Sequence, residues 1–271
     1  MNGNPLYPPP QMNSNRLPLV RQVRFDKNQS RLEYMAKNAY IYGYPLVLMN
    51  TTKKAAAGTQ LNQFIHERTF PTPAYKTIVR ANVDTLYSFA CLDLNKEPVV
   101  LSVPDTHQRY YLMELLDAWT NVFASLGART TGTRAGAYAI CGPNWNGKLP
   151  EDLVRIDSPN YTVFIGGRTQ TNGSTDFAAV HAIQNQYALI PLSNWGNPDI
   201  QNQNPDEKEK SNGNPVAQVT NMSAVVFFQT MVKAMAINPP WIADPKMNRT
   251  LAVLGLSPDS RFDFQRLSPP V

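Results

Sequence analysis

A dense run of polar side chains separates two apolar stretches near residue 80. It contains Arg80, Asn82, Asp84, Tyr87 and Ser88. Polar groups next to a core must be hydrogen-bonded, so two interpretations are open. In one, the run is a structural turn in which Asn82 and Asp84 bond backbone amides. In the other, it is a pocket floor where Asp84 is the general base, Arg80 stabilises developing negative charge and Tyr87 lines the wall.

Three further segments carry side chains that could bind a small ligand. Trp119 stands between Asp117 and Asn121, so its ring could stack on a ligand whose polar edge its neighbours would hold. Arg129 opens a run of small polar residues that could cradle an anion. Arg168 follows two glycines and could hold a carboxylate or phosphate, or stabilise negative charge during catalysis. Each segment also has a structural alternative. Trp119 could fill the end of a β-sandwich, the run after Arg129 could be a plain hairpin, and Arg168 could be a structural residue at a strand bulge.

The sequence lacks the motifs of several common enzyme classes. It contains no G-x-S-x-G nucleophile elbow, no nucleotide P-loop pattern and no zinc-binding spacing of His and Cys. The three histidines lie far along the chain from any marked Ser or Cys. We therefore expect neither a metal nor a cofactor, although a carboxylate Ca²⁺ or Mg²⁺ site at Asp84 or Asp117 stays open.

The distribution of charged and apolar residues indicates which partners the protein could bind and where in the cell it could reside. The net charge is +5, but the basic residues are spread out and form no dense stripe, so we expect no nucleic-acid partner. No apolar run approaches the roughly 20 residues of a membrane span. The first ten residues lack the features of a signal peptide. The sequence therefore predicts a protein of the cytoplasm or of a virion, without a membrane span.

The composition predicts a folded core. Hydrophobic residues make up 42% of the chain, which excludes wholesale disorder. Cys91 and Cys141 both lie in apolar runs and are expected to be buried thiols, with a single disulfide as the alternative.

The spacing of apolar residues predicts helices at both ends and strands between them. Residues 1–29 are rich in proline and are expected to form an extended arm. A capping box at Ser30 begins a helix that Gly43 and Pro45 interrupt, with a second short helix reaching about Asn50. Strands are expected within residues 77–79, 86–94, 99–103, 109–116, 137–141 and 161–165.

The later part of the chain returns to helical patterns. Helices are expected after Thr175, with one face that extends to Tyr187, and after the caps Ser223 and Asp244. Residues 194–214 are expected to form a surface loop. The sequence thus predicts an α+β fold with an antiparallel β-sandwich or jelly-roll-like core. We expect one domain over residues 30–264 and a tail over 265–271.

The order of the motifs resembles a known family, the domain of unknown function 1254. The resemblance is carried by RANVDTLYSFACLDL, YYLMELLDAWTNVFASLGARTTGT, GPNWNGKLP, GRTQTNGSTDFAAVHAIQNQY and NPPWIADPKMNRTLAVLGL, and it covers about residues 32–264. It implies a β-sandwich-like domain with added helices, in a family found mostly in bacteria and also in large DNA viruses. Members usually continue into a domain of unknown function 1214, whereas this chain stops at Val271.

The resemblance supplies no secure catalytic residues. Its polar motifs add Trp145 to the candidates given above, which are Arg80, Asn82, Asp84, Tyr87, Asp117, Trp119, Asn121, Arg129 and Arg168. Three functions remain open: a hydrolase or lyase acting on a small polar or amphipathic molecule, a structural protein of a virion or surface layer, and a non-catalytic ligand-binding module. A homo-oligomer is expected, because a ligand site shared with a missing domain would need a second subunit.

Overall fold

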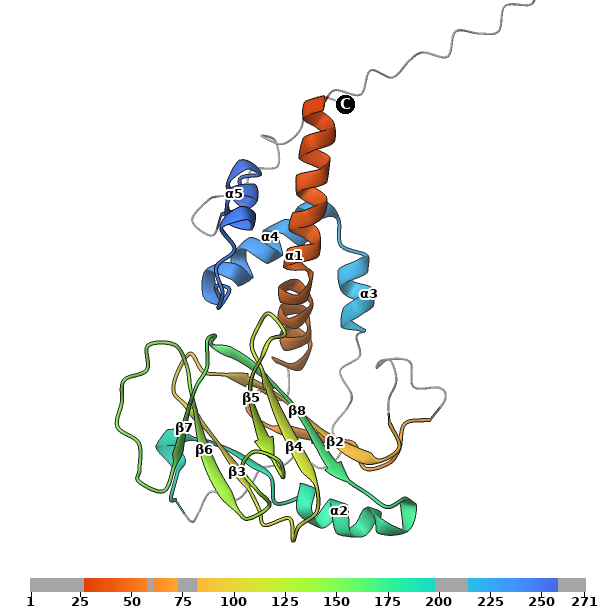
Figure 1. Cartoon of the computed structure of the whole chain (residues 1–271), viewed down its shortest axis with the longest axis vertical. Helices are drawn as coiled ribbons and strands as arrows, with labels where there is room; N and C mark the ends of the chain where they lie inside the picture. Colours follow the sequence, from red (N-terminus) through yellow and green to blue (C-terminus); the bar gives the residue numbers. More distant parts are fainter. Residues whose placement is uncertain (1–26, 58–60, 73–81, 198–213, 258–271) are drawn as a thin grey trace, which may run out of the picture.

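The computed structural model describes residues 27–57, 61–72, 82–197 and 214–257. Two β-sheets face each other, and a layer of helices sits on one end of the sandwich (Figure 1). This layer contains α1 (Lys27–Ala57), α3 (Pro215–Thr220), α4 (Ala224–Ile237) and α5 (Pro245–Val253). A further helix, α2 (Phe177–Gln184), lies at the opposite end of the sandwich. The predicted α+β sandwich with helices at both ends of the chain is confirmed.

The larger sheet has five strands in the order β1-β2-β8-β4-β5, and all of its pairs are antiparallel. These strands are β1 (Phe64–His66), β2 (Thr85–Asp93), β8 (Thr162–Gln170), β4 (Tyr111–Leu116) and β5 (Val122–Gly127). The smaller sheet has the order β7-β6-β3-β9. Its strands are β7 (Val154–Asp157), β6 (Gly136–Cys141), β3 (Val99–Val103) and β9 (Ala188–Pro191). The β6–β7 pair is parallel and departs from the expected antiparallel pattern.

Alternating residues of both sheets fill the space between them. Leu92 and Met113 from the larger sheet meet Leu101 and Ile140 from the smaller one, and each of these side chains is fully buried. Successive side chains of a strand point to opposite faces, so every second residue enters this core. The central strand β8 pairs with β2 on one side and with β4 on the other. Residues at its two ends therefore reach the two ends of the sandwich.

The N-terminal helix differs from the prediction. It begins at Lys27 rather than Ser30, and it continues through Gly43 and Pro45 instead of breaking there. A Cβ on Gly43 would overlap the Met231 side chain of α4, so glycine permits the close contact between the two helices. An interior proline costs a helix about 3 kcal/mol, and packing against α4 offsets that cost. Residues 1–26 of the predicted arm lie outside the described residues.

Several other boundaries follow from contacts that periodicity does not reveal. The helix expected after Thr175 ends at Gln184, and Tyr187 instead enters the core, where its hydroxyl lies 2.9 Å from Thr169 Oγ1. Strands β1, β5, β7 and β9 were not predicted, and the expected strand at residues 77–79 lies outside the described residues. The predicted caps Ser223 and Asp244 are confirmed, because each side chain accepts a backbone N–H of its helix.

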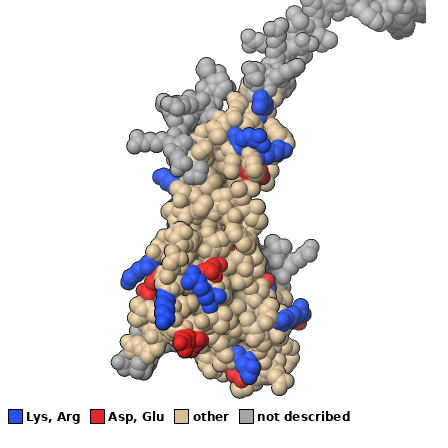
Figure 2. Space-filling model, turned by 60° about the vertical axis from the view of Figure 1, so that its left-hand side comes forward, with Lys and Arg blue, Asp and Glu red and all other residues tan. Residues whose placement is uncertain are grey.

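The helical layer is joined to the sandwich by buried hydrogen bonds. Trp119 Nε1 donates to the carbonyl of Asn238 at 2.9 Å, and Asn160 Nδ2 donates to the carbonyl of Pro239 at 2.9 Å. Figure 2 shows charged side chains toward the two ends of the molecule, with a narrow middle that carries few on this face. None of the described helices is long and apolar enough to span a membrane.

Candidate functional site

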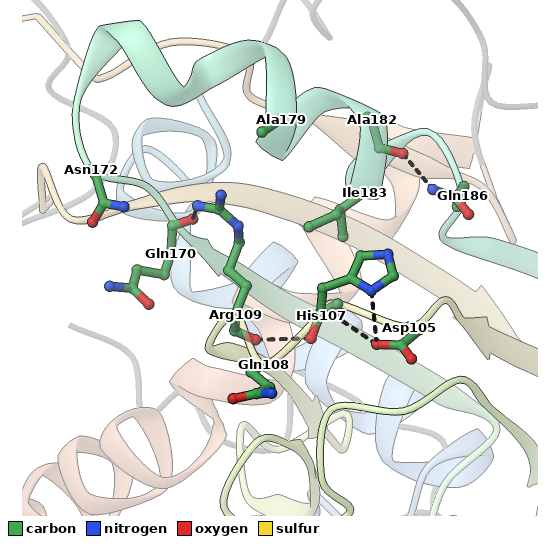
Figure 3. A pocket seen from close by; sticks show the side chains of 11 residues that line it. Asp105, His107, Gln108, Arg109, Gln170, Asn172, Ala179, Ala182, Ile183 and Gln186 are labelled. Atoms are coloured by element: carbon green, nitrogen blue, oxygen red, sulfur yellow. Dashed lines mark hydrogen bonds and ion pairs between the residues drawn. The ribbon is translucent and has the colours of Figure 1, made fainter.

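A pocket of about 490 Å³ opens at the end of the sandwich away from the helical layer. One wall is α2, and the opposite wall is the turn between β3 and β4 (Figure 3). The end of β8 and the residues after it close the third side. The pocket is lined by Asp105, Thr106, His107, Gln108, Arg109, Gln170, Asn172, Ala179, Ala182, Ile183 and Gln186. Its volume falls in the range of small-molecule sites, about 300–1,000 Å³.

The β3–β4 turn holds an uncommon backbone conformation at the pocket. His107 and Gln108 have φ angles of 51° and 65°, a left-handed region that glycine or asparagine usually occupies in such turns. The turn is closed by the N–H of Arg109, which donates to the carbonyl of Thr106 at 3.0 Å. The buried Thr106 also bonds to Thr133 of the next hairpin. Such conformations cost of order 1 kcal/mol or more per residue and occur often at ligand sites.

Arg109, the cationic side chain of the pocket, is paired within the protein. Arg109 donates from both terminal nitrogens to the two carboxylate oxygens of Asp176, at 2.5 and 2.9 Å, and also to the carbonyl of Gln170. Hydrogen bonding from Arg109, together with the N–H of Asn172, lowers the pKa of Asp176. Asp105 Oδ1 accepts the His107 N–H at 2.7 Å and lies 3.7 Å from His107 Nδ1.

The amide side chains of the pocket make fewer hydrogen bonds within the protein than Arg109 does. Gln186 Nε2 donates to the carbonyl of Ala182 at 2.8 Å. The side-chain amides of Gln108, Gln170 and Asn172 make no hydrogen bond to another described residue. Each amide offers two donors and one acceptor oxygen. A small polar ligand could therefore meet both donors and acceptors on this side of the pocket.

The polar run near residue 80 lies beside this pocket without lining it. The side-chain oxygen of Asn82 accepts the N–H groups of Asp84 and Thr85 at 2.9 and 2.8 Å, and its amide donates to Tyr87 at 2.8 Å. The Asp84 side chain is exposed, and its carbonyl accepts the N–H of Thr171 at 2.9 Å. Thr171 lies between the pocket residues 170 and 172, so Asp84 adjoins the pocket rim.

Arg168 and Tyr87 meet on the outer face of the larger sheet. They are directly paired across β8 and β2, and the guanidinium carbon lies 6.0 Å from the centre of the Tyr87 ring. Arg168 Nη1 also donates to Glu114 Oε2 of β4 at 3.2 Å. Gln170, two residues further along β8, is a pocket residue. Arg80, the other arginine proposed to stabilise developing negative charge, lies outside the described residues.

The segment around Trp119 lies at the other end of the sandwich. The fully buried Asp117 accepts the N–H groups of Trp119 and Asn121, both at 2.8 Å, and the Asn121 amide at 2.9 Å. The Trp119 ring packs 5.0 Å from the ring of Tyr42 on α1. These bonds form a turn that supports the helical layer, so the segment has a structural role in the fold.

Two further candidates stand apart from both groups. Arg129 is exposed in the hairpin after β5 and lies 5.7 Å from the ring of Tyr110. Trp145 packs on the outside of the smaller sheet, where its ring lies 5.2 Å from the guanidinium of Arg155. Neither side chain lines the pocket, and both make cation–π contacts of the kind that occur on many protein surfaces.

Sequence reasoning also missed a buried polar network between β1, β2 and α2. His66 Nδ1 lies 2.9 Å from the fully buried Ser88 Oγ, which Gln184 Nε2 also approaches at 3.3 Å. His66 Nε2 is buried and has no hydrogen-bond partner among the described residues. Burial, with a smaller contribution from Arg68, lowers the pKa of His66 to about 3. The ring is therefore neutral at ordinary pH.

Thiol and metal chemistry find little support in the described residues. Cys91 and Cys141 are both free and buried, as expected from the apolar runs around them. Burial raises the pKa of Cys91 to about 12, which keeps the thiolate scarce. Within the described part of the chain, no three His, Cys, Asp or Glu side chains are grouped closely enough to hold a metal ion.

The comparison with protein families supports the resemblance seen in the sequence. Residues 61–191, just under half of the chain, match the family described as "Protein of unknown function (DUF1254)". The central part of the chain is therefore similar to this family. This segment contains all nine strands of the described residues, and it includes the β3–β4 turn and α2. The residues that line the pocket therefore all lie within the segment that matches this family.

A solved structure shares the fold. The VPA0106 protein from Vibrio parahaemolyticus superposes with a TM-score of 0.62 at 24% sequence identity. The match covers 87% of this chain and 55% of the Vibrio chain, so this chain spans about half the length of that protein. The structural match extends beyond residues 61–191 into the helical layer. No curated protein matches the chain.

The pocket residues were missed for a physical reason. The run Asp105–Arg109 follows a proline and has the composition of a solvated turn. Its one unusual feature is that His and Gln stand where a tight hairpin turn favours Asn and Gly. That mismatch was a usable signal. The α2 wall carried none, because alanines on an amphipathic helix do not indicate a ligand.

Proposed function

We propose that the chain is a small-molecule-binding domain whose ligand occupies the pocket between α2 and the β3–β4 turn. The observation that carries this proposal is the set of exposed side chains at Gln108, Gln170 and Asn172, which line a pocket of about 490 Å³ and whose amides make no hydrogen bond to another described residue. Polar groups on the wall of a concave site are the usual means of orienting a bound molecule. The left-handed turn supports the same interpretation, because the fold retains a costly conformation there.

Binding is favoured over catalysis by the state of the charged groups. Arg109 is held by Asp176, and Arg168 by Glu114, so neither guanidinium is directed at a shared reaction centre. General acid–base catalysis requires an acid or base within hydrogen-bond reach of the reacting atoms. Asp84, the proposed base, is not among the residues that line the pocket.

The experiment fills the pocket and compares it with a neighbouring control. Ala179 and Ala178 are adjacent exposed residues of α2, but only Ala179 lines the pocket. We expect Ala179→Trp to remove the binding of small polar compounds detected by NMR, whereas Ala178→Trp leaves it intact. Binding that survives Ala179→Trp, with both variants folded, would place the ligand elsewhere and refute the proposal.

A hydrolase or lyase remains the second candidate. It is favoured by the exposed carboxylate of Asp84, which adjoins the pocket rim through the bond between its carbonyl and Thr171. In this alternative Asp84 is the general base for a small polar or amphipathic substrate. Asp84→Asn should then abolish turnover of a pocket ligand while the melting temperature stays nearly unchanged. Retained turnover would exclude this role for Asp84.

An assembly role is favoured by a different surface. The helical layer exposes large apolar side chains, with 67% of Tyr34, 59% of Ile41 and 79% of Ile242 accessible. Exposed apolar surface of this kind often marks a contact between proteins. Native mass spectrometry separates the alternatives: a large uniform oligomer without bound mass supports a structural protein, and a small species with a defined additional mass supports ligand binding.

A further inference from the structure

We propose that the ligand of this pocket is an uncharged, polyhydroxylated molecule of about the size of a monosaccharide. This inference rests on the proposed function, since it names the chemical class that the same pocket would take. The pocket combines an arginine that Asp176 neutralises, exposed amides without partners among the described residues, and a small apolar wall. The first feature favours an uncharged ligand, the second favours hydroxyl groups, and the third favours an apolar C–H face.

The charges of the pocket offer little to an ionised ligand. The fork of Arg109 already binds both oxygens of Asp176 and a carbonyl oxygen of Gln170. A ligand carboxylate or phosphate would have to displace these bonds, which are of the strong, charge-assisted kind. A cationic ligand would meet Asp105, whose side chain is 47% exposed, so water screens the attraction of this carboxylate.

The amides suit a ligand that both donates and accepts hydrogen bonds. Gln108, Gln170 and Asn172 each present an acceptor oxygen and an NH₂ group with two donors. A hydroxyl group is itself one donor and an acceptor, so several hydroxyls on one ring can satisfy these amides together. A single charged group would satisfy only the donors or only the acceptors among these amides, whereas a hydroxyl can satisfy either.

The α2 wall suits the C–H face of a sugar or polyol. Ala179, Ala182 and Ile183 project toward the pocket from α2, and none carries a polar side-chain atom (Figure 3). Burying apolar ligand surface against them contributes roughly 25 cal/mol per Å². The small alanines also leave room that larger residues would fill. Together with the amides, this wall makes the pocket amphipathic.

The experiment uses three analogues that differ mainly in charge: D-glucose, D-glucosamine and D-glucuronate, each titrated into the isotope-labelled chain near neutral pH. We expect glucose to shift the side-chain amide signals of Gln170 and Asn172, with an affinity about tenfold or more above that of the charged analogues. The variant Gln170→Lys adds a positive charge at an exposed position, and it should reverse the order in favour of glucuronate by a similar factor.

A second variant tests the neutralised arginine directly. Asp176→Asn removes the carboxylate that binds Arg109, so the affinity for glucuronate should rise relative to that for glucose. If this variant does not fold, Gln170→Lys still tests whether a free positive charge in the pocket favours glucuronate. Glucuronate or glucosamine binding as well as glucose in the natural chain would overturn the inference, as would the absence of glucose binding. In either case, binding of another compound that Ala179→Trp removes would leave the proposed function standing. If neither glucose nor any other compound binds in a way that Ala179→Trp removes, both proposals are refuted.

Discussion

A shift from pH 7 to pH 5 should destabilise the folded chain through His66. The His66 ring, on β1, is partly buried; its Nδ1 lies 2.9 Å from Ser88 Oγ, and its buried Nε2 has no partner among the described residues. Rings of Phe64 and Tyr187 lie 5.5 and 6.4 Å away. A proton on this ring would place a charge in apolar surroundings and near Arg68, which lowers the pKa of His66 to about 3.

The magnitude follows from the difference between the folded and unfolded pKa values. An unfolded histidine has a pKa of about 6.5, so the unfolded chain takes up a proton that the folded chain refuses. The stabilising contribution is present above pH 6.5 and is lost as the pH falls from there toward the folded pKa of about 3. Between pH 7 and pH 5 the expected loss is about 2 kcal/mol, which corresponds to roughly 4–8 °C in Tm.

The assay compares urea unfolding of the natural chain and His66→Asn at pH 7 and pH 5. Asparagine keeps a polar partner for Ser88 but does not titrate, so the variant should lose about 2 kcal/mol less between the two pH values. His107, whose side chain is 86% exposed, provides the matched control, because His107→Asn should leave the pH dependence unchanged. Equal losses in the natural chain and His66→Asn would refute the assignment of this acid sensitivity to His66.

Two other predictions concern the thiols and the helix contact. In the folded chain, Cys91 and Cys141 should react with a thiol reagent only after unfolding, because both are buried and burial raises both pKa values; rapid modification of the native protein would contradict this. Gly43→Ala should lower the free energy of unfolding by roughly 1–3 kcal/mol, since its Cβ would overlap Met231, whereas Lys37→Ala on the exposed side of α1 should change it little in the same urea experiment.

The sequence determined the parts of the fold that rest on local rules. The predicted strand at residues 99–103 coincides with β3. The strand predicted at 86–94 is shifted by one residue at both ends from β2, and the one at 137–141 begins one residue after β6 begins. Alternation of apolar residues and β-branched side chains suffices there, because a buried strand must present the same pattern wherever it lies. The caps at Ser223 and Asp244 were predictable for a similar reason, since the side chain bonds an N–H two or three residues away.

Tertiary contacts determined where helices continue or end at positions where local sequence rules conflict with packing. Gly43 and Pro45 are helix breakers by themselves, yet α1 continues through them, because Met231 fills the space above the glycine from almost two hundred residues further along the chain. Tyr187 fits the apolar face of a longer helix, but its ring is drawn into the core and its hydroxyl to Thr169. Neither contact leaves a mark in the neighbouring sequence.

The candidate site shows the same division. The sequence offered a turn around Asn82 as one of two interpretations, and this turn depends on residues close in the chain. It did not identify the pocket, whose walls come from the β3–β4 turn and from α2, about seventy residues apart. Amides in loops look like ordinary solvated side chains. Only the packing of the two sheets brings them around one cavity, because the free energy of burying the core fixes which loops become neighbours.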